Sequence, residues 1–115
     1  MTQQNPDQTP PNIDLLAANL ESRADEVAAM LSAMANPKRL IVLCALLEGE
    51  RSVGDLATLV QLSPAALSQH LGKMRMLHLV DTRRAAQTIH YRLASAEVRA
   101  VLQTLYQLYC APNHR

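Results

Sequence analysis

The chain of 115 residues contains two cysteines, Cys44 and Cys110, and their thiols are the side chains best suited to redox or nucleophilic chemistry. Cys44 lies inside the apolar run 40–47, where a free cysteine commonly packs as a small hydrophobic residue. Cys110 lies close to the polar segment 112–115. A reactive cysteine needs a nearby cation or helix N-terminus, and neither cysteine has a basic residue three or four positions before it. From the sequence alone, the thiols are either inert or activated by tertiary neighbours.

Other kinds of reactive site are poorly supplied with donors. His114 follows Cys110 by four positions and could join both cysteines as a metal ligand, but a tetrahedral zinc site needs four donors. A thiol enzyme or sulfur carrier would use a Cys-x-x-Cys pair or a cysteine beside a general base, and the sequence has neither pattern. We therefore expect no catalytic residue, no metal site, no cofactor and no enzymatic activity. A metal-ion sensor that uses Cys44, Cys110 and His114 remains an alternative.

The segment 53–77 is predicted to form two helices joined by a tight turn at Gln61 and Leu62. Polar and basic side chains gather in this segment. In a helix-turn-helix of this kind, the second helix enters the major groove and its N-terminal residues meet base edges. Small residues would let it sit deep, amide and hydroxyl groups suit base edges, and the helix N-terminus attracts phosphate. The residues expected to contact double-stranded DNA are Ser63, Pro64, Ala65, Ala66, Ser68, Gln69, His70 and Lys73.

Two extended segments, residues 80–84 and 88–93, follow on either side of Ala85, Ala86 and Gln87. Alternation of apolar and polar residues in the second segment predicts a strand with one face in water, formed by Thr88, His90 and Arg92. A basic hairpin after a helix-turn-helix is a wing, which contacts the DNA backbone or minor groove. The side chains expected to do so are Arg83, Arg84, Gln87 and Arg92. The predicted fold is mainly α with a β-hairpin wing, a winged helix-turn-helix.

The distribution of charge supports a polyanionic partner. Residues 1–50 carry seven acidic and three basic side chains, whereas residues 64–99 carry six basic and two acidic ones. Such asymmetry suggests one face made for nucleic acid. The chain has no Phe or Trp and three Tyr, which argues against a base-stacking module for single strands.

Capping residues place the helix boundaries. The expected N-caps are Asn12, Ser22 in a capping box with Asp25, Asn36 before Pro37, Ser52, Ser63 before Pro64, and Ser95. The helix of residues 37–48 is expected to stop at Gly49. The inward residues of the two DNA-binding helices are expected to be Leu56, Leu59, Val60, Leu67, Leu71, Met74 and Leu77.

These elements form one domain, residues 12–111, between a disordered arm of residues 1–11 and a tail of residues 112–115. Apolar residues on the first helix (Leu15, Leu16, Leu20) and on more than one face of the last helix predict a homodimer. The N-terminus lacks the apolar core of a signal peptide, and the longest apolar run, residues 40–47, is too short to span a bilayer. We therefore expect a soluble, cytoplasmic protein with no membrane partner.

Four sequence stretches resemble the ArsR/SmtB family of small repressors. They are residues 33–40 (AMANPKRL), 46–56 (LLEGERSVGDL), 62–71 (LSPAALSQHL) and 90–93 (HYRL), and the resemblance covers roughly residues 24–110. It implies a winged-helix dimer joined through its first and last helices, which binds an operator palindrome and releases it when an inducer binds.

The family's known metal sites are not matched, but the cysteine positions are informative. One site has Cys-x-Cys where this chain reads Ser52, Val53 and Gly54; another needs Asp and His on the last helix, where residues 96–109 have Glu97 and no histidine. One cysteine in each position of Cys44 and Cys110 resembles the BigR/SqrR subgroup of persulfide- and redox-responsive repressors of sulfide-oxidation genes. That resemblance implies that a disulfide or polysulfide bridge between these thiols releases DNA. Metal sensing, or constitutive DNA binding with inert thiols, remains open.

Overall fold

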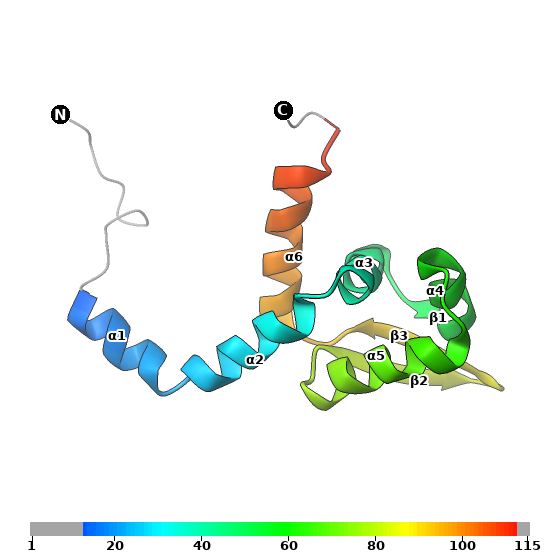
Figure 1. The fold of residues 1–115 in the computed structure, drawn as a ribbon, viewed down its shortest axis with the longest axis horizontal. Helices are drawn as coiled ribbons and strands as arrows, with labels where there is room; N and C mark the ends of the chain where they lie inside the picture. The colour runs from blue at the N-terminus through cyan, green and yellow to red at the C-terminus, as the bar shows by residue number, and fades with distance from the viewer. Residues whose placement is uncertain (1–12, 113–115) are drawn as a thin grey trace.

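The computed structural model describes residues 13–112, and it arranges them as helices around a small antiparallel sheet (Figure 1). The elements in chain order are α1 (Ile13–Glu21), α2 (Ala24–Met34), α3 (Pro37–Ala45), the 3-10 helix η2 (Leu46–Glu48), β1 (Arg51–Ser52), α4 (Val53–Val60), α5 (Pro64–Met76), β2 (Val80–Ala85), β3 (Thr88–Leu93) and α6 (Ala96–Tyr109). This is the mainly helical fold with a β-hairpin that the sequence predicts.

Local capping explains where most helices begin. The side chains of Asn36, Ser52, Ser63 and Ser95 each accept a hydrogen bond from the backbone N–H three positions later, as expected for N-caps. The capping box at Ser22 is wrong, because its Oγ donates to the carbonyl of Asn19 and helix α2 begins after Arg23 without a side-chain cap. The expected cap Asn12, the arm of residues 1–11 and residues 113–115 of the tail lie outside the described residues.

The sheet has three strands in the order β1-β3-β2. Strands β2 and β3 form the predicted hairpin, with Thr82 opposite Tyr91 and a two-residue turn whose first residue, Ala86, has φ of 56°. The sequence did not indicate β1, because two residues are too short to show alternation; Arg51 pairs with Tyr91. His90, expected on the wet face of β3, is half-buried.

The core lies between α3, α4, α5, α6 and the sheet. Its fully buried side chains include Val42, Leu43, Leu56, Leu67, Leu71, Met74 and Leu102. One inward residue was expected wrongly: Leu59 is 47% exposed, while its helix neighbours Leu56 and Val60 are buried. Helix α4 is only eight residues long and turns a narrow face to the core, so Leu59 falls outside it.

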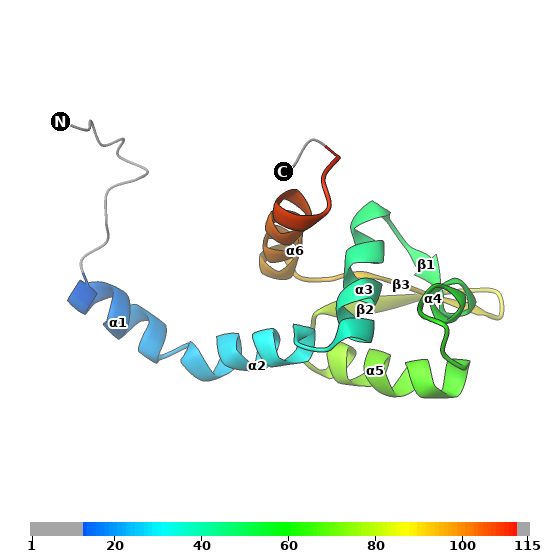
Figure 2. The same cartoon turned by 45° about the horizontal axis from the view of Figure 1, so that its top comes forward.

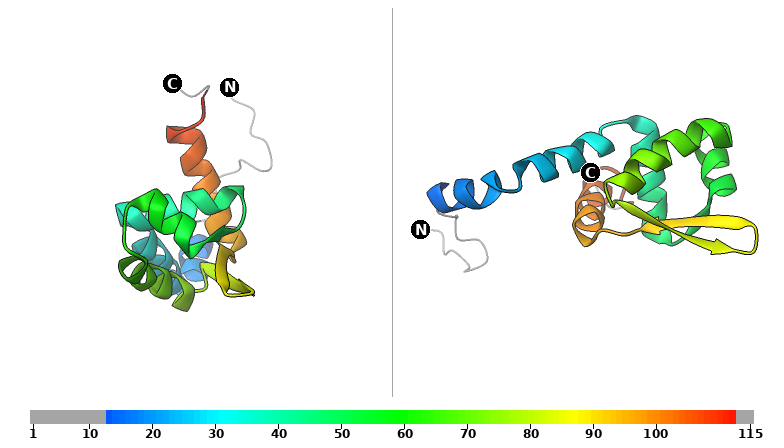
Figure 3. Two further views of the ribbon diagram at one scale, coloured as in Figure 1. Left: turned by 90° about the vertical axis from the view of Figure 1, so that its right-hand side faces the viewer. Right: turned by 90° about the horizontal axis from the view of Figure 1, so that it is seen from below.

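Helices α1 and α2 extend away from this body, whereas α6 stands beside it (Figure 2). Seen from below, α1 and the tip of the β2–β3 hairpin lie at opposite ends of the molecule (Figure 3). Within residues 13–112 no single helix is long and apolar enough to cross a membrane; helices α2 and α3–η2 pass only as a pair, and that pair is bent by 94°.

Candidate nucleic-acid interface and thiol pair

Helices α4 and α5 form the helix-turn-helix, and buried leucines fix their relative orientation. Leu56 and Val60 of α4 pack in the same core as Leu67 and Leu71 of α5. The turn between the helices is made possible by Gln61, which adopts a left-handed conformation with φ of 59°. The predicted turn at Gln61 and Leu62 is therefore confirmed.

The outer face of α5 presents most of the predicted DNA-contacting residues to solvent. Ser63, Pro64, Ala65, Ser68, Gln69 and Lys73 are exposed, and Ala66 is half-buried. The hydroxyl oxygen of Ser63 accepts a hydrogen bond from the N–H of Ala66, which satisfies one of the free donors at the start of the helix. The remaining N–H groups of the first turn, together with the helix dipole, make this end attractive to a phosphate.

His70 differs from its neighbours, because it is half-buried and its ring faces another element. Its Nδ1 lies 3.4 Å from Nη1 of Arg39, which belongs to α3. Arg39 also donates from Nε to the carbonyl of Ala33 at 2.6 Å and from Nη2 to that of Ser32 at 3.5 Å. A single guanidinium therefore joins the C-terminal end of α2 to α5, the helix predicted to contact DNA.

The wing is basic, but two of its arginines are already paired. Glu50 accepts hydrogen bonds from Arg83 at 2.8 Å and lies 3.7 Å from Arg92, which is also 4.0 Å from Asp81. The hydrogen bond from Arg83 lowers the pKa of Glu50 below its ordinary value and, reciprocally, raises the pKa of Arg83. Arg84 is exposed and has no ion-pair partner in the described part of the chain. The uncharged Gln87 is exposed as well.

The two cysteines are both free and lie at the α3–α6 side of the molecule. Cys44, on α3, is half-buried and lines a hollow of about 340 Å³ with Leu47, Glu48, Gln103, Tyr106 and Gln107. Cys110 is exposed at the C-cap of α6. Burial raises the pKa of the Cys44 thiol, and a charge on Cys110 raises it further.

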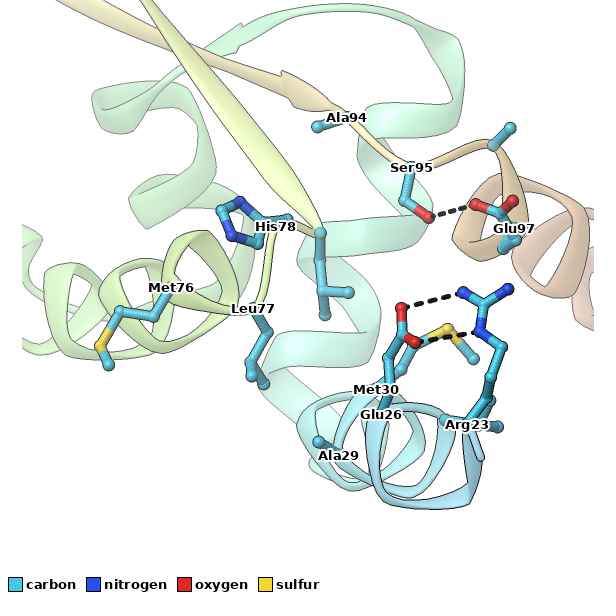
Figure 4. A pocket seen from close by; sticks show the side chains of 13 residues that line it. Arg23, Glu26, Ala29, Met30, Met76, Leu77, His78, Ala94, Ser95 and Glu97 are labelled. Carbon is cyan, nitrogen blue, oxygen red and sulfur yellow. Dashed lines mark hydrogen bonds and ion pairs between the residues drawn. The ribbon is translucent and has the colours of Figure 1, made fainter. Parts of the chain in front are cut away.

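A larger hollow of about 500 Å³ lies on another side, between α2, the α5–β2 connection and the start of α6 (Figure 4). Arg23 and Glu26 form an ion pair at its rim, and Ser95 donates to Glu97 across from them. His78, in the connection between α5 and β2, is exposed there with φ of 62°. This hollow contains neither a cysteine nor a predicted DNA-contacting residue.

A metal centre has little support among residues 13–112, where no three His, Cys, Asp or Glu side chains gather closely enough to hold an ion. His114, the third ligand of the metal-sensor alternative, lies outside the described residues.

The helix-turn-helix, the wing and their order along the chain agree with what comparison with known proteins finds. Residues 36–82 match the family described as "Bacterial regulatory protein, arsR family". The transcriptional activator HlyU of Vibrio cholerae is 47% identical over 94 residues, which are 82% of this chain and 87% of HlyU. This chain belongs to the ArsR family. It is a transcriptional regulator of the winged helix-turn-helix type, and not an enzyme.

Further relatives agree in sequence and fold. A biofilm growth-associated repressor of Agrobacterium fabrum is 44% identical over 82% of this chain and 80% of its own length. The structure of reduced HlyU from Vibrio cholerae matches with a TM-score of 0.78 and 46% identity, covering 81% of this chain and 98% of that one. A homodimeric winged helix-turn-helix DNA-binding domain from Mycobacterium bovis matches with a TM-score of 0.68 and 30% identity, over 74% of this chain and 79% of that one.

Two residues that organise the interface did not stand out in the sequence. Arg39 and Glu50 each contact a residue more than 30 positions away, His70 and Arg83 respectively. Arg39 lies in the quoted stretch 33–40, but neither periodicity nor charge indicates its partner. Only the fold brings these pairs together.

Proposed function

We propose that this protein is a cytoplasmic, homodimeric repressor that binds double-stranded operator DNA and senses reactive sulfur species or oxidants through Cys44 and Cys110. Bridging of the two thiols releases the operator and derepresses sulfide-detoxification genes. The observation that carries the proposal is the pair of free thiols: Cys44 is half-buried on α3 in a hollow that Tyr106 and Gln107 of α6 also line, and Cys110 is exposed at the end of that same helix. That a relative, HlyU, has a structure described as reduced supports a redox role.

The raised pKa of Cys44 assigns different roles to the two cysteines. A half-buried thiol whose pKa is raised is mostly protonated at neutral pH, so it is a poor first nucleophile. Cys110 is exposed and accessible. Its thiolate attacks the outer sulfur of a persulfide R–S–SH, which forms Cys110–S–SH and releases R–S⁻. Cys44 then loses its proton to water and attacks the inner sulfur, which forms the disulfide and releases HS⁻.

The DNA-binding residues of this proposal come from α5 and the wing. On α5 we assign contacts to Ser63, Pro64, Ala65, Ala66, Ser68, Gln69, His70 and Lys73; on the wing we assign them to Arg83, Arg84 and Gln87. The support is the exposure of most of these side chains and the position of α5 as the second helix of the unit. Arg83 is paired with Glu50, so it would contact a phosphate in one of two ways: after releasing Glu50, or with Glu50 still bound to it.

A bridge can affect the DNA-binding surface because α3 packs against α4, the first helix of the helix-turn-helix. Helix α6 packs on α3 and η2, so a covalent link from Cys110 to Cys44 would fix one helix against the other. In a dimer, two recognition helices must sit about 34–36 Å apart to enter successive major grooves. A switch from mostly bound to mostly free needs a difference in DNA affinity of about 5.5 kcal/mol between the reduced and bridged proteins.

The deciding experiment combines intact-protein mass spectrometry with operator binding after exposure to a persulfide donor. We expect loss of two hydrogens, or gain of sulfur between the cysteines, together with release of DNA. Cys44→Ser and Cys110→Ser should each bind DNA and ignore the donor. Release of DNA from either single variant as readily as from the parent would contradict the two-thiol mechanism and favour another inducer. Release by metal ions alone would favour the metal-sensor alternative, and binding that ignores both would favour inert thiols.

A further inference from the structure

Arg39 lies where the helices α2, α3 and α5 meet. Its contacts with all three helices are not explained by a role in touching DNA. In the first turn of α3, its backbone N–H donates to the side chain of the N-cap Asn36. Its guanidinium donates to the carbonyls of Ser32 and Ala33 near the end of α2. The carbonyl of Ala33 has no other donor among residues 13–112, whereas that of Ser32 also accepts from the backbone N–H of Ala35 at the helix C-cap. Both carbonyls carry the negative end of the helix dipole, so a cation there is stabilising. The third contact, from Nη1 to Nδ1 of His70, leaves this helix end and reaches α5.

The chemistry of the two groups fixes which of them donates in that contact. An arginine guanidinium has N–H donors only and cannot accept a hydrogen bond. Nδ1 of His70 must therefore be the acceptor, which requires it to carry no proton. A neutral imidazole then has its proton on Nε2, on the far side of the ring from Arg39.

The Nε2 atom of His70 is not fully buried. No buried side-chain nitrogen or oxygen lacks a partner in the described part of the chain, and the contact with Arg39 uses Nδ1. Because the half-buried His70 has no other hydrogen bond there, its Nε2 keeps access to solvent, on the helix that also carries the exposed residues Gln69 and Lys73.

We propose that Arg39 is a positioning residue for DNA binding, which holds His70 in the tautomer that offers an Nε2–H donor from the recognition helix. The acceptor is a DNA oxygen or nitrogen, either a phosphate oxygen or the acceptor edge of a base. Because the same guanidinium holds the end of α2, the orientation of this donor is tied to the arm that α1 and α2 form. The inference rests on DNA binding by α5, and it does not depend on the thiol switch.

Two substitutions of His70 separate its two nitrogens. The side-chain amide of Asn places its polar atoms near the position of Nδ1, whereas that of Gln reaches the position of Nε2. His70→Asn can still accept from Arg39 but has no donor toward DNA; His70→Gln keeps that donor. We expect His70→Asn to lose about tenfold in DNA affinity and His70→Gln to retain most of it. Equal losses in both variants, or none in His70→Asn, would overturn the proposal.

A double-mutant cycle then tests whether Arg39 acts through His70. Arg39→Lys keeps the charge at the end of α2 but loses the planar fork that reaches both partners. We expect it to weaken DNA binding in the wild-type background and to have little further effect in His70→Asn. The control is Lys38→Met, which removes the 2.6 Å hydrogen bond from Lys38 to the carbonyl of Val60; among residues 13–112, Lys38 makes no hydrogen bond or ion pair with α5. If Arg39→Lys weakens binding equally in both backgrounds, its role is structural and the proposal is wrong.

The full-length reduced protein is used throughout, with two duplexes: an operator selected from a randomised pool and one of unrelated sequence. Equal losses on both would assign the acceptor to phosphate, and a loss confined to the operator would assign it to a base. Nitrogen-15 spectra of the histidine rings give a readout that is independent of affinity: we expect an unprotonated Nδ1 and a protonated Nε2 for His70. A protonated Nδ1 would overturn the proposal. Absence of binding by the wild-type protein to either duplex would instead contradict the proposed function.

Discussion

Gln69 and Arg84 are both exposed, yet they stand on different parts of the interface and should contribute differently. Gln69 lies in the second turn of the recognition helix, where an amide can bond adenine through two atoms. We expect Gln69→Ala to cost about 1–3 kcal/mol on the cognate site and to relax discrimination between sequences. Binding to an operator and to its single-base variants would measure this.

Arg84 of the wing provides the contrasting case. It has no ion-pair partner in residues 13–112, so its charge is available to phosphate. We expect Arg84→Ala to weaken binding to all sequences alike and to reduce the slope of log affinity against log salt by about one. Titrations at several salt concentrations test both residues, and a uniform loss in Gln69→Ala would contradict the assignment of base reading to that side chain.

The two thiols should also differ in intrinsic reactivity. Burial is the main cause that raises the pKa of Cys44, and it persists without Cys110, so the thiolate fraction of Cys44 at neutral pH is below that of an ordinary cysteine. In single-cysteine variants we expect iodoacetamide to modify Cys110 faster than Cys44. The rate at Cys44 should continue to increase as the pH rises above the ordinary cysteine pKa. A faster reaction at Cys44 would exclude Cys110 as the first nucleophile.

At the scale of elements, Glu50 controls how much of the wing's charge is free. Its carboxylate holds Arg83 and lies near Arg92, so Glu50→Gln should release Arg83 and leave Arg92 with Asp81 as its one acidic neighbour among these pairs. We expect stronger binding to unrelated DNA and a steeper salt dependence, by about one unit of slope for each arginine that gains a phosphate. The control is Glu48→Gln, which changes the net charge equally but breaks only the pair with Arg51. Equal effects of the two variants would show that net charge alone matters.

The ion pair of Glu50 with Arg83 makes the stability of the fold depend on pH in a definite direction. Arg83 lowers the pKa of Glu50 in the folded protein, so the pair stabilises the fold above the ordinary glutamate pKa. That contribution is lost as the pH falls through the lowered folded pKa. We expect the difference in unfolding temperature between wild type and Glu50→Gln to be present at neutral pH and to disappear in acid. A difference that persists unchanged in acid would mean that the carboxylate charge does not stabilise the wing.

The sequence was informative where structure is set by neighbours along the chain. Four serine or asparagine caps and the hairpin were predictable because a cap or a short turn involves residues only a few positions apart. The contact of Arg39 with His70 and that of Glu50 with Arg83 span 31 and 33 positions, so no local pattern reports them. Leu59 was wrongly placed because its spacing fits an inward face, while the actual packing of a short helix decides which leucines are buried.

At the scale of the whole molecule, the fold of one chain does not explain why the arm formed by α1 and α2 projects from the body with apolar side chains exposed. Helix α1 packs against α2 and projects from the body (Figure 2). Ile13 is 70% exposed and Leu20 is 48% exposed, and at the end of α6 Tyr109 is 78% exposed. Apolar surface of this extent on the first and last helices is expected to be buried by a second copy of the chain.

Leu20→Glu tests this arrangement with little risk to the fold of the single chain, because the side chain is half-exposed there. A charge placed in an apolar dimer contact must lose its hydration, so the variant should shift from dimer toward monomer in sedimentation experiments at micromolar concentration. The control is Leu59→Glu, which introduces the same charge at a leucine of nearly equal exposure, 47%, on α4. That variant should remain dimeric. A wild-type protein that sediments as a monomer, or a Leu20→Glu protein as dimeric as its control, would contradict a dimer built on α1. Because a monomer contacts one half-site instead of two, loss of the dimer should also weaken operator binding far more than binding to a single half-site.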